Sequence, residues 1–359
     1  MRILFASGNG YIPEFSGGVQ SNTDHLAREL KVRGHEISVL AALFGDGFAG
    51  LRARLALKVT RRAYAVDHIH GYRVLRAWTP EAAVDAVVAN WAPEVAVVQC
   101  HRSVAIGRSL MRRGVPLVVY LHNVEFDELA GDPRDLAGAV FIANSAFTAN
   151  AYRKAFGIEA VVIPPAIDKA VFTTETSKEF VTFINIDEKK GVDKALEIAR
   201  DNPDIPFLFV ESWVLGDEAL KAFAARTRDL SNVTFMRRQS DMAKVYGRTR
   251  ILLAPSRWEE AWGRVASEAH CSGIPVIGSN RGGLPDAIGT GGVALDFDAP
   301  VSTWSQALRS LWFDEAAYDV ASARAKDYAD RPALDTDHQV QTLISLIAAA
   351  VERPAADGV

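Results

Sequence analysis

Residues 255 to 283 read PSRWEEAWGRVASEAHCSGIPVIGSNRGG, and their order of apolar and polar residues predicts the fold of this region. One apolar run, ILLAPS, ends at Ser256, and a second run, IPVIGS, lies inside the quoted segment. Between the two runs we expect a helix over residues 264–272. A strand, a helix and a second strand in this order are typical of a parallel sheet that helices cover on both faces.

The same alternation extends along the rest of the chain. Further helices are expected at residues 80–91, 104–113, 192–200 and 241–247. The expected strands are short apolar runs: RILFAS, EISVLAA, YRVLRAW, VAVVQC, PLVVYLHN, VFIANS and AVVIPP in the first half, and VTFINI, FLFVES, NVTFMR and GVALDF in the second. The sequence therefore predicts an α/β protein with two doubly wound, Rossmann-like parallel sheets.

The length of the chain also favours two domains. Its 359 residues exceed the roughly 250 to 300 at which one hydrophobic core stops growing. Pro164 and Pro165 can continue neither a helix nor a central strand, so we place the domains at residues 1–165 and 166–334. The stretch TDHQVQTLISLIAAAVER predicts a final helix at about residues 335–355. Its periodicity does not reveal the domain on which it packs.

Composition excludes several classes of protein. The formal net charge is −4, which gives no reason to expect a nucleic-acid partner. The two cysteines, Cys100 and Cys271, are far apart, which argues against a disulfide scaffold or a cysteine metal cluster and suits a reducing compartment. The chain has no secretory leader pattern at its start and no apolar run of about 18 residues, so we expect a cytoplasmic protein.

A glycine loop follows the first expected strand in SGNGYIPEFSGGVQ. Gly17 and Gly18 stand directly before a helix, where backbone N–H groups could approach a phosphate, although glycines also simply form turns. A third glycine in the GxGxxG spacing is absent from SGNGYI, so NAD binding is disfavoured.

Two carboxylates bracket the start of the helix in the opening segment. Glu260 and Glu268 are eight positions apart, which along a helix is up to about 12 Å. This separation is too large for the carboxylate pair of a glycosidase. It matches the length of a nucleotide sugar, with one carboxylate for sugar hydroxyls, the other for the ribose, and the diphosphate over the helix start near Gly263. The alternative is that both are ordinary surface glutamates.

At these residues the chain resembles the retaining GT-B glycosyltransferases of sequence family four. The resemblance covers nearly the whole chain, through FSGGVQ, YLHN, ANS, KKGVDKALEIA and APSRWEEAWGRVASEAHCSGIPVIGSNRGGLPDAI. It implies two domains that face each other across a cleft, the first on the acceptor side and the second binding the donor. It also implies that the C-terminal helix packs back on the first domain.

The resemblance implies roles for residues of the second domain. Glu260 matches the glutamate that binds hydroxyls of the donor sugar, and Glu268 matches the ribose-binding glutamate. Lys190 matches the lysine that neutralises the diphosphate. The backbone amides that border the sugar and the diphosphate are those of Ala261, Trp262 and Gly263.

In the first domain, the resemblance implies that Gly17 and Gly18 approach the diphosphate and that His122 lies near the reacting sugar carbon. His122 also suits a hydrogen-bonded structural role at the end of a strand.

One position departs from the family pattern. The family carries an arginine shortly before the lysine, whereas FINIDEKKG has Asn185 there. Lys189 is expected to point another way. Arg237 and Arg238 are candidates for the second cation, and a solvent-facing role suits them equally.

The resemblance and the chemistry of these residues imply a metal-independent transfer, with retention, from a nucleotide-diphosphate sugar to an acceptor hydroxyl. No metal-ligand motif and no cofactor other than the donor substrate are expected. The acceptor is a carbohydrate, a lipid-linked molecule or a small molecule. Two alternatives remain open: a catalytically silent nucleotide-sugar binding protein, and a GT-B-fold nucleotide-sugar epimerase or phosphorylase.

A basic segment, LRARLALKVTRRAYAV, spans residues 51–66. Its alternation of basic and apolar residues suits a surface that touches anionic lipid at the inner membrane face or a phosphorylated acceptor. Because this stretch contains no Trp or Phe, a solvated helix in a first-domain insertion is favoured over peripheral membrane contact.

Overall fold

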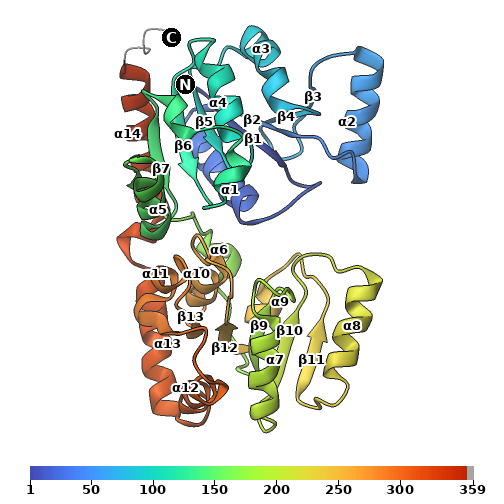
Figure 1. Ribbon diagram of the computed structural model, residues 1–359, viewed down its shortest axis with the longest axis vertical. Coiled ribbons are helices and arrows are strands. Elements are labelled where there is room, and N and C mark those ends of the chain that lie inside the picture. The colour runs from blue at the N-terminus through green and yellow to red at the C-terminus, as the bar shows by residue number, and fades with distance from the viewer. Residues whose placement is uncertain (354–359) are drawn as a thin grey trace. The chain divides into compact units, whose positions relative to one another are not determined.

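The computed structural model describes residues 1–353 and divides into two compact units (Figure 1). Unit 1 contains Met1–Ala166 together with the chain from Ala333 onward, and unit 2 contains Ile167–Pro332. Each unit is built around one largely parallel sheet with helices on both faces, so the predicted fold class is confirmed. No helix within residues 1–353 is long and apolar enough to cross a membrane.

The sheet of unit 1 has eight strands in the order β3-β4-β2-β1-β5-β6-β7-β8. All neighbouring strands are parallel except β3 and β4, which are antiparallel. The strands are β1 Arg2–Gly10, β2 Glu36–Ala42, β3 Ala65–Asp67, β4 Arg73–Ala77, β5 Val95–Gln99, β6 Leu117–Leu121, β7 Val140–Ala143 and β8 Val161–Val162.

Two apolar layers cover this sheet. Helices α1 (Gly18–Val32) and α14 (Thr336–Glu352) bury Leu26 and Leu343 against one face. Helices α3 (Pro80–Trp91), α4 (Ser103–Met111) and α5 (Ala146–Phe156) cover the other face. Because both faces are covered, the strands consist of nearly continuous apolar residues. Short 3-10 turns lie at Phe126–Leu129 and Pro133–Leu136.

The C-terminal helix α14 belongs to unit 1, where it packs on β6 and β7. Val340, Leu343 and Ile347 are fully buried in this contact. The side chain of Gln339 donates to the carbonyl of Pro164 at 3.1 Å, which fixes the start of the helix. Of the residues expected in this helix, 354 and 355 lie outside the described part of the chain.

The sheet of unit 2 has six parallel strands in the order β11-β10-β9-β12-β13-β14. They are β9 Phe180–Ile184, β10 Phe207–Val210, β11 Val233–Met236, β12 Thr249–Ala254, β13 Val276–Ser279 and β14 Gly292–Leu295. The helices are α6 Lys169–Phe172, α7 Val192–Asp201, α8 Asp217–Thr227, α9 Ala243–Tyr246, α10 Arg264–Cys271, α11 Leu284–Ile288, α12 Val301–Phe313 and α13 Glu315–Ala329, with a 3-10 turn at Gly289–Gly291. A further 3-10 turn, Pro332–Leu334, lies where the chain passes back to unit 1.

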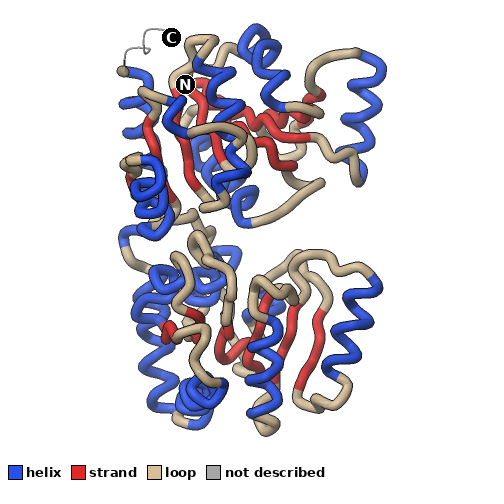
Figure 2. Tube along the Cα trace, in the orientation of Figure 1, coloured by secondary structure: helices blue, strands red, loops and turns tan. Residues whose placement is uncertain are grey.

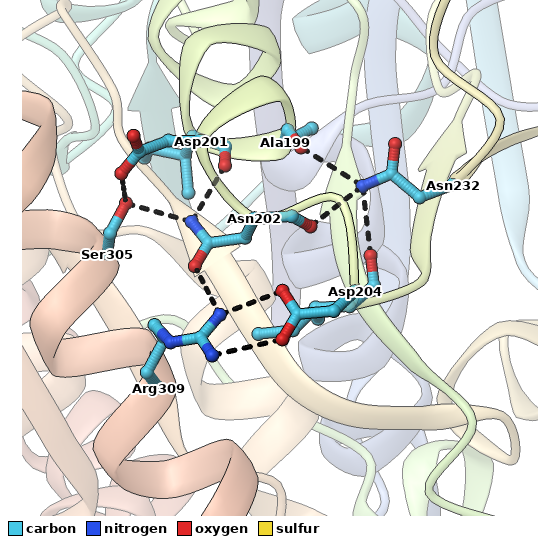
Figure 3. A network of polar contacts seen from close by, with 9 residues as sticks. Ala199, Asp201, Asn202, Asp204, Asn232, Ser305 and Arg309 are labelled. Carbon is cyan, nitrogen blue, oxygen red and sulfur yellow. Dashed lines mark hydrogen bonds and ion pairs between the residues drawn. The ribbon is translucent and has the colours of Figure 1, made fainter.

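Polar contacts fasten unit 2 at the amino ends of its strands. The buried amide of Asn202 donates to Ser305 of α12 at 2.8 Å, and Arg309 pairs with Asp204 at 2.8 Å (Figure 3). The amide of Asn232 donates to three backbone carbonyls, those of Ala199, Asn202 and Ile205. Because this network lies at the amino edge of the sheet, it leaves the carboxyl edge for other functions.

The basic segment of unit 1 differs from its expected form. Helix α2 spans Gly47–Thr60 and ends where Arg61 adopts a left-handed backbone conformation, with φ 53°. The chain then continues into β3, beside which α2 lies at one end of unit 1 (Figure 2). The helix therefore begins four residues before Leu51 and stops before Val66, and it includes Phe48, which the predicted segment left out.

Candidate active site

Three loops of unit 2 meet at the carboxyl edge of its sheet, because parallel strands all end on the same side. They follow β9, β12 and β13 and bring together Lys190, Ser256 and Glu260. The ammonium of Lys190 lies 2.6 Å from Oε1 of Glu260, and the hydroxyl of Ser256 donates to the same oxygen at 2.9 Å. The Lys190 and Glu260 side chains are 26% and 16% exposed. Two residues that were predicted to bind the donor are thus in direct contact.

A glycine allows the first two loops to come together. Gly191 has φ 82°, and a Cβ on it would lie 1.8 Å from the carbonyl oxygen of Pro255. The backbone N–H groups of Arg257 and Trp258 both donate to the carbonyl of Lys189 at 2.9 Å. The loop after β12 is therefore fixed to the KKG turn, which places Lys190 beside Glu260.

The third loop holds the backbone of Glu260. The N–H of Gly283 donates to the Glu260 carbonyl at 2.6 Å. Gly282 has φ 62°, and a Cβ on it would lie only 2.2 Å from that carbonyl oxygen. From the sequence alone, Gly282 and Gly283 were part of a motif with no role of their own. Two adjacent glycines after an apolar strand were the signal of this close approach.

The start of α10 lies directly after Glu260. Gly263 precedes the helix with φ 100°, and a Cβ on it would lie 2.5 Å from Cδ1 of Leu284. The indole of Trp262 is 5% exposed and donates to the Ser267 hydroxyl at 3.0 Å, so this side chain anchors the turn. Within residues 1–353, the N–H groups of Ala261, Trp262 and Gly263 donate to no other group. An anion can accept from them beside the positive end of the helix.

Glu268 lies just over one turn into α10 and is 9% exposed. The hydroxyl of Tyr246 donates to its Oε2 at 2.9 Å, and Nε of Arg264 lies 3.3 Å from its Oε1. Burial, together with the Glu268 carboxylate, raises the pKa of Tyr246 well above its usual range, so Tyr246 remains a donor. Neither partner of Glu268 was predicted from the sequence, and Tyr246 gives no local signal because it is 22 residues away.

Asn185 follows β9 with φ 75° and is 5% exposed. Its Oδ1 is buried and has no hydrogen-bond partner among the described residues. The position therefore holds a neutral amide beside the carboxyl edge. Lys189 lies over the ring of Trp258, 4.2 Å from the centroid, so it points away from the contact that Lys190 makes with Glu260.

Glu211 follows β10 and is 2% exposed. It accepts from the backbone of Leu215 at 2.7 Å and of Arg238 at 3.1 Å, and Nε of Arg237 lies 3.0 Å away. Burial alone would raise the pKa of Glu211, but these N–H groups and the two arginine charges lower it below its usual range. The carboxylate thus holds Arg237, which was a candidate for the second cation.

In unit 1, His122 follows β6 and is 7% exposed. Its ring stacks on Tyr120 with centroids 4.0 Å apart, and its carbonyl accepts from the Asn144 amide at 3.1 Å. Asn144 belongs to the ANS motif, so that motif positions the His122 loop. Gly17 precedes α1 in an extended conformation and Gly18 is the first residue of the helix. Gly17 therefore needs no left-handed backbone.

Two protein-family models match this chain, one over its first half and one over its second. Residues 16–171 match the family model described as Glycosyltransferase Family 4, and residues 165–328 match the model described as Glycosyl transferases group 1.

Curated relatives match over shorter stretches. The chain is 32% identical over 174 residues to D-inositol 3-phosphate glycosyltransferase of Segniliparus rotundus, covering 42% of this chain and 38% of that protein. It is 30% identical over 138 residues to spore coat protein SA of Bacillus subtilis, covering 34% and 37%. The matched stretches thus span less than two fifths of these relatives' length.

Solved structures match over almost the whole chain. A glycosyltransferase from Rickettsia africae superimposes with a TM-score of 0.77 at 14% identity, covering 98% of this chain and 99% of that one. Anabaena HepE in complex with UDP-glucose gives 0.75 at 18% identity, covering 97% and 100%. These likenesses confirm the predicted GT-B fold class. Since the two family models together match residues 16–328, the chain belongs to the family-four glycosyltransferases.

Proposed function

We propose that this protein transfers a sugar from a nucleoside diphosphate sugar to an acceptor hydroxyl, with retention of the anomeric configuration and without a metal ion. The observation that carries the proposal is the contact between Lys190 and Glu260, with the N–H groups of residues 261–263 beside it. A cation, a carboxylate and an anion-binding helix start suit the charged and hydroxylated parts of one donor molecule.

In this proposal each group has one partner on the donor. Lys190 neutralises the diphosphate, whose oxygens also accept from the N–H groups of Ala261, Trp262 and Gly263. Glu260 accepts from sugar hydroxyls, and Glu268 accepts from the ribose hydroxyls. Tyr246 and Arg264 are positioning residues, because they hold the Glu268 carboxylate from one side.

The chemical step follows from these charges. The bond between the anomeric carbon and the diphosphate oxygen breaks, and a bond from the acceptor oxygen to the same face of that carbon forms. The acceptor proton passes to the departing diphosphate. Negative charge grows on the leaving group, so Lys190 and the N–H dipoles favour the transition state over the ground state. For His122, Gly17 and Gly18 of unit 1, the proposal keeps the roles that the resemblance implies.

A uridine diphosphate hexose is the first donor to test, because one structure of similar fold, Anabaena HepE, holds UDP-glucose. The acceptor is a carbohydrate, a lipid-linked molecule or a small molecule. The donor is a substrate, and no separate cofactor takes part.

The experiment measures binding and turnover of UDP-, GDP- and ADP-sugars by the full chain in EDTA. A ligand at 100 times its dissociation constant adds about 2.7 kcal/mol of stability, so thermal shift identifies the nucleotide. Nucleoside diphosphate release then reports turnover, and the anomeric configuration of the product reports retention. Glu268→Gln should weaken nucleotide binding about tenfold, since one hydrogen bond to a charged group is lost. Glu259→Gln is the matched control, because Glu259 is exposed and adjacent to Glu260.

Other results of this experiment would indicate other functions. Nucleotide binding without release or transfer would identify a silent binding protein, which the neutral Asn185 keeps as the second candidate. Conversion of the donor to its epimer would identify an epimerase. Turnover that EDTA abolishes and Mg²⁺ restores would contradict metal independence.

A further inference from the structure

Helix α2 of unit 1 exposes a continuous apolar stripe. Phe48, Leu51, Leu55 and Val59 are 81%, 59%, 64% and 74% exposed. Their spacing of three or four residues places all four on one side of the helix. The opposite side is already covered, since Leu57 is buried with Leu43 and Ala65. The four side chains of the stripe therefore take no part in packing the helix against unit 1.

Cations flank the stripe. On the helix, Arg52 lies beside one edge, and Arg54 and Lys58 lie beside the other, as the 3.6-residue turn dictates. Arg61 and Arg62 follow directly. All five are exposed, and none makes an ion pair with another residue of the described chain. Residues 47–66 contain no Asp or Glu, although the whole chain carries a net charge of −4. We call the stripe and these five cations the α2 surface.

The start of α2 is firmly attached to the body of unit 1. The Glu14 carboxylate accepts from the N–H of Gly45 at 2.8 Å, two residues before the helix. It also pairs with Arg76 at 2.9 Å, and neither side chain is more than 1% exposed. Phe15 and Phe44, both more than 40% exposed, form an edge-to-face pair at 5.7 Å in the same region. The apolar stripe is thus presented on a fixed support and does not depend on a loose loop.

We propose that the α2 surface docks this protein onto a membrane that contains anionic lipid. A helix with an exposed apolar stripe and basic borders lies in the plane of the interface, with its apolar side chains among the acyl chains and its cations at the headgroups. A second copy is a poorer occupant, because a two-fold dimer would place five cations against the same five cations. A soluble anion would engage the cations but leave Phe48 and Val59 in water. This inference is independent of the proposed sugar transfer.

Lipid charge and apolar insertion make separate contributions. Each Lys or Arg close to an anionic surface strengthens binding roughly fivefold, so loss of two weakens it about thirtyfold. Each buried methylene contributes roughly a further fourfold. Screening shortens the Debye length from about 8 Å at 0.15 M salt to about 3 Å at 1 M. High salt should therefore remove the contribution of the cations to binding and leave that of the apolar side chains.

The test is flotation of the full chain with phosphatidylcholine vesicles that contain either no phosphatidylglycerol or one third of it. We expect binding only to the anionic vesicles. Lys58→Gln with Arg62→Gln should reduce this binding about thirtyfold, and Leu55→Gln with Val59→Gln by at least tenfold. Glutamine is used because it keeps high helix propensity. The matched control is Val320→Gln with Arg324→Gln, an exposed pair on α13 of unit 2, which should bind like the unchanged protein.

Equal binding to neutral and anionic vesicles, or no binding to either, would overturn the proposal. So would an equal loss in the α13 control. A dimer in light scattering that the α2 substitutions abolish would assign the α2 surface to a second copy instead. Nucleotide binding of each variant should match that of the unchanged protein, since α2 lies in unit 1 and the proposed donor site in unit 2. Thermal unfolding should also match, because the replaced side chains are exposed.

Discussion

Replacing Glu260 by Gln should tighten the binding of a free nucleoside diphosphate and slow sugar transfer. In the absence of a ligand, the Lys190 ammonium lies 2.6 Å from the Glu260 carboxylate. A diphosphate therefore competes with Glu260 for this cation and is also repelled by the carboxylate. Glutamine keeps the size of the side chain and removes both effects.

The contact geometry sets the size of the change. Ion pairs at the surface contribute about 0.2 to 1 kcal/mol, and this pair belongs at the upper end because its side chains are only 26% and 16% exposed. About 1 kcal/mol corresponds to a UDP dissociation constant roughly five times lower. A hydrogen bond to a charged group contributes about 1.5 to 3 kcal/mol, so loss of the carboxylate that holds the sugar should slow transfer at least tenfold.

The assay is titration calorimetry with UDP, or with whichever nucleotide the thermal shift identifies, alongside nucleoside diphosphate release from the sugar donor. Lys190→Ala in the Glu260→Gln background should erase the gain in affinity, because the gain acts through Lys190. Glu259→Gln should change neither measurement. Unchanged or weaker UDP binding by Glu260→Gln would refute the reasoning, as would a gain that persists without Lys190.

Two further changes test the support of the site and the pH response of unit 2. Gly282→Ala should lower transfer at least tenfold, since its Cβ would lie 2.2 Å from the Glu260 carbonyl oxygen at φ 62°; Gly216→Ala, with nothing within 4 Å, should be silent in the same rate assay. Burial, and then the charge of Arg331, lowers the pKa of His270 to about 3, against about 6.5 in the unfolded chain. The unfolded state thus binds this proton first as pH falls, and the stability present above pH 6.5 drops by about 2 kcal/mol at pH 5. Urea unfolding measures this loss as the fall in the free energy of unfolding between a pH above 6.5 and pH 5. The fall should be about 2 kcal/mol smaller in the His270→Gln variant than in the unchanged protein. Equal falls in the two proteins would contradict the assignment.

The parallel strands could be predicted because each is a nearly continuous apolar run between turn residues. This pattern is local, so it can be recognised in the sequence without knowing which residues are in contact. The antiparallel strand β3 has only three residues and one buried side chain, so it carries no such pattern. The same holds for the end of α2: a left-handed Arg61 leaves no mark in the sequence. The start of α2 at Gly47 was not predicted either, so the expected basic segment excluded Phe48, the most exposed apolar residue of that helix.

Positions of the candidate site residues could be predicted more easily than their partners. Glu260 and Lys190 are 70 positions apart, and their contact depends on the close approach of Gly191 to Pro255. Such an approach is a property of two loops together, and neither loop encodes it alone.

The neutral side chain at Asn185 changes what the Lys190–Glu260 pair does. With a second cation at that position, one positive charge would remain for the diphosphate while Glu260 held the other. Here Lys190 is paired with Glu260, Lys189 lies over Trp258, and Arg237 is held by the buried Glu211. Under the proposed function, attraction of the diphosphate would then come largely from the N–H groups of residues 261–263 until Glu260 turned to the sugar. Because that turn requires sugar hydroxyls as new donors to the carboxylate, the free cation and the correctly bound sugar appear together. Under the proposed function, the site would thereby couple leaving-group neutralisation to the presence of the sugar, and a nucleoside diphosphate without its sugar would gain least from Lys190.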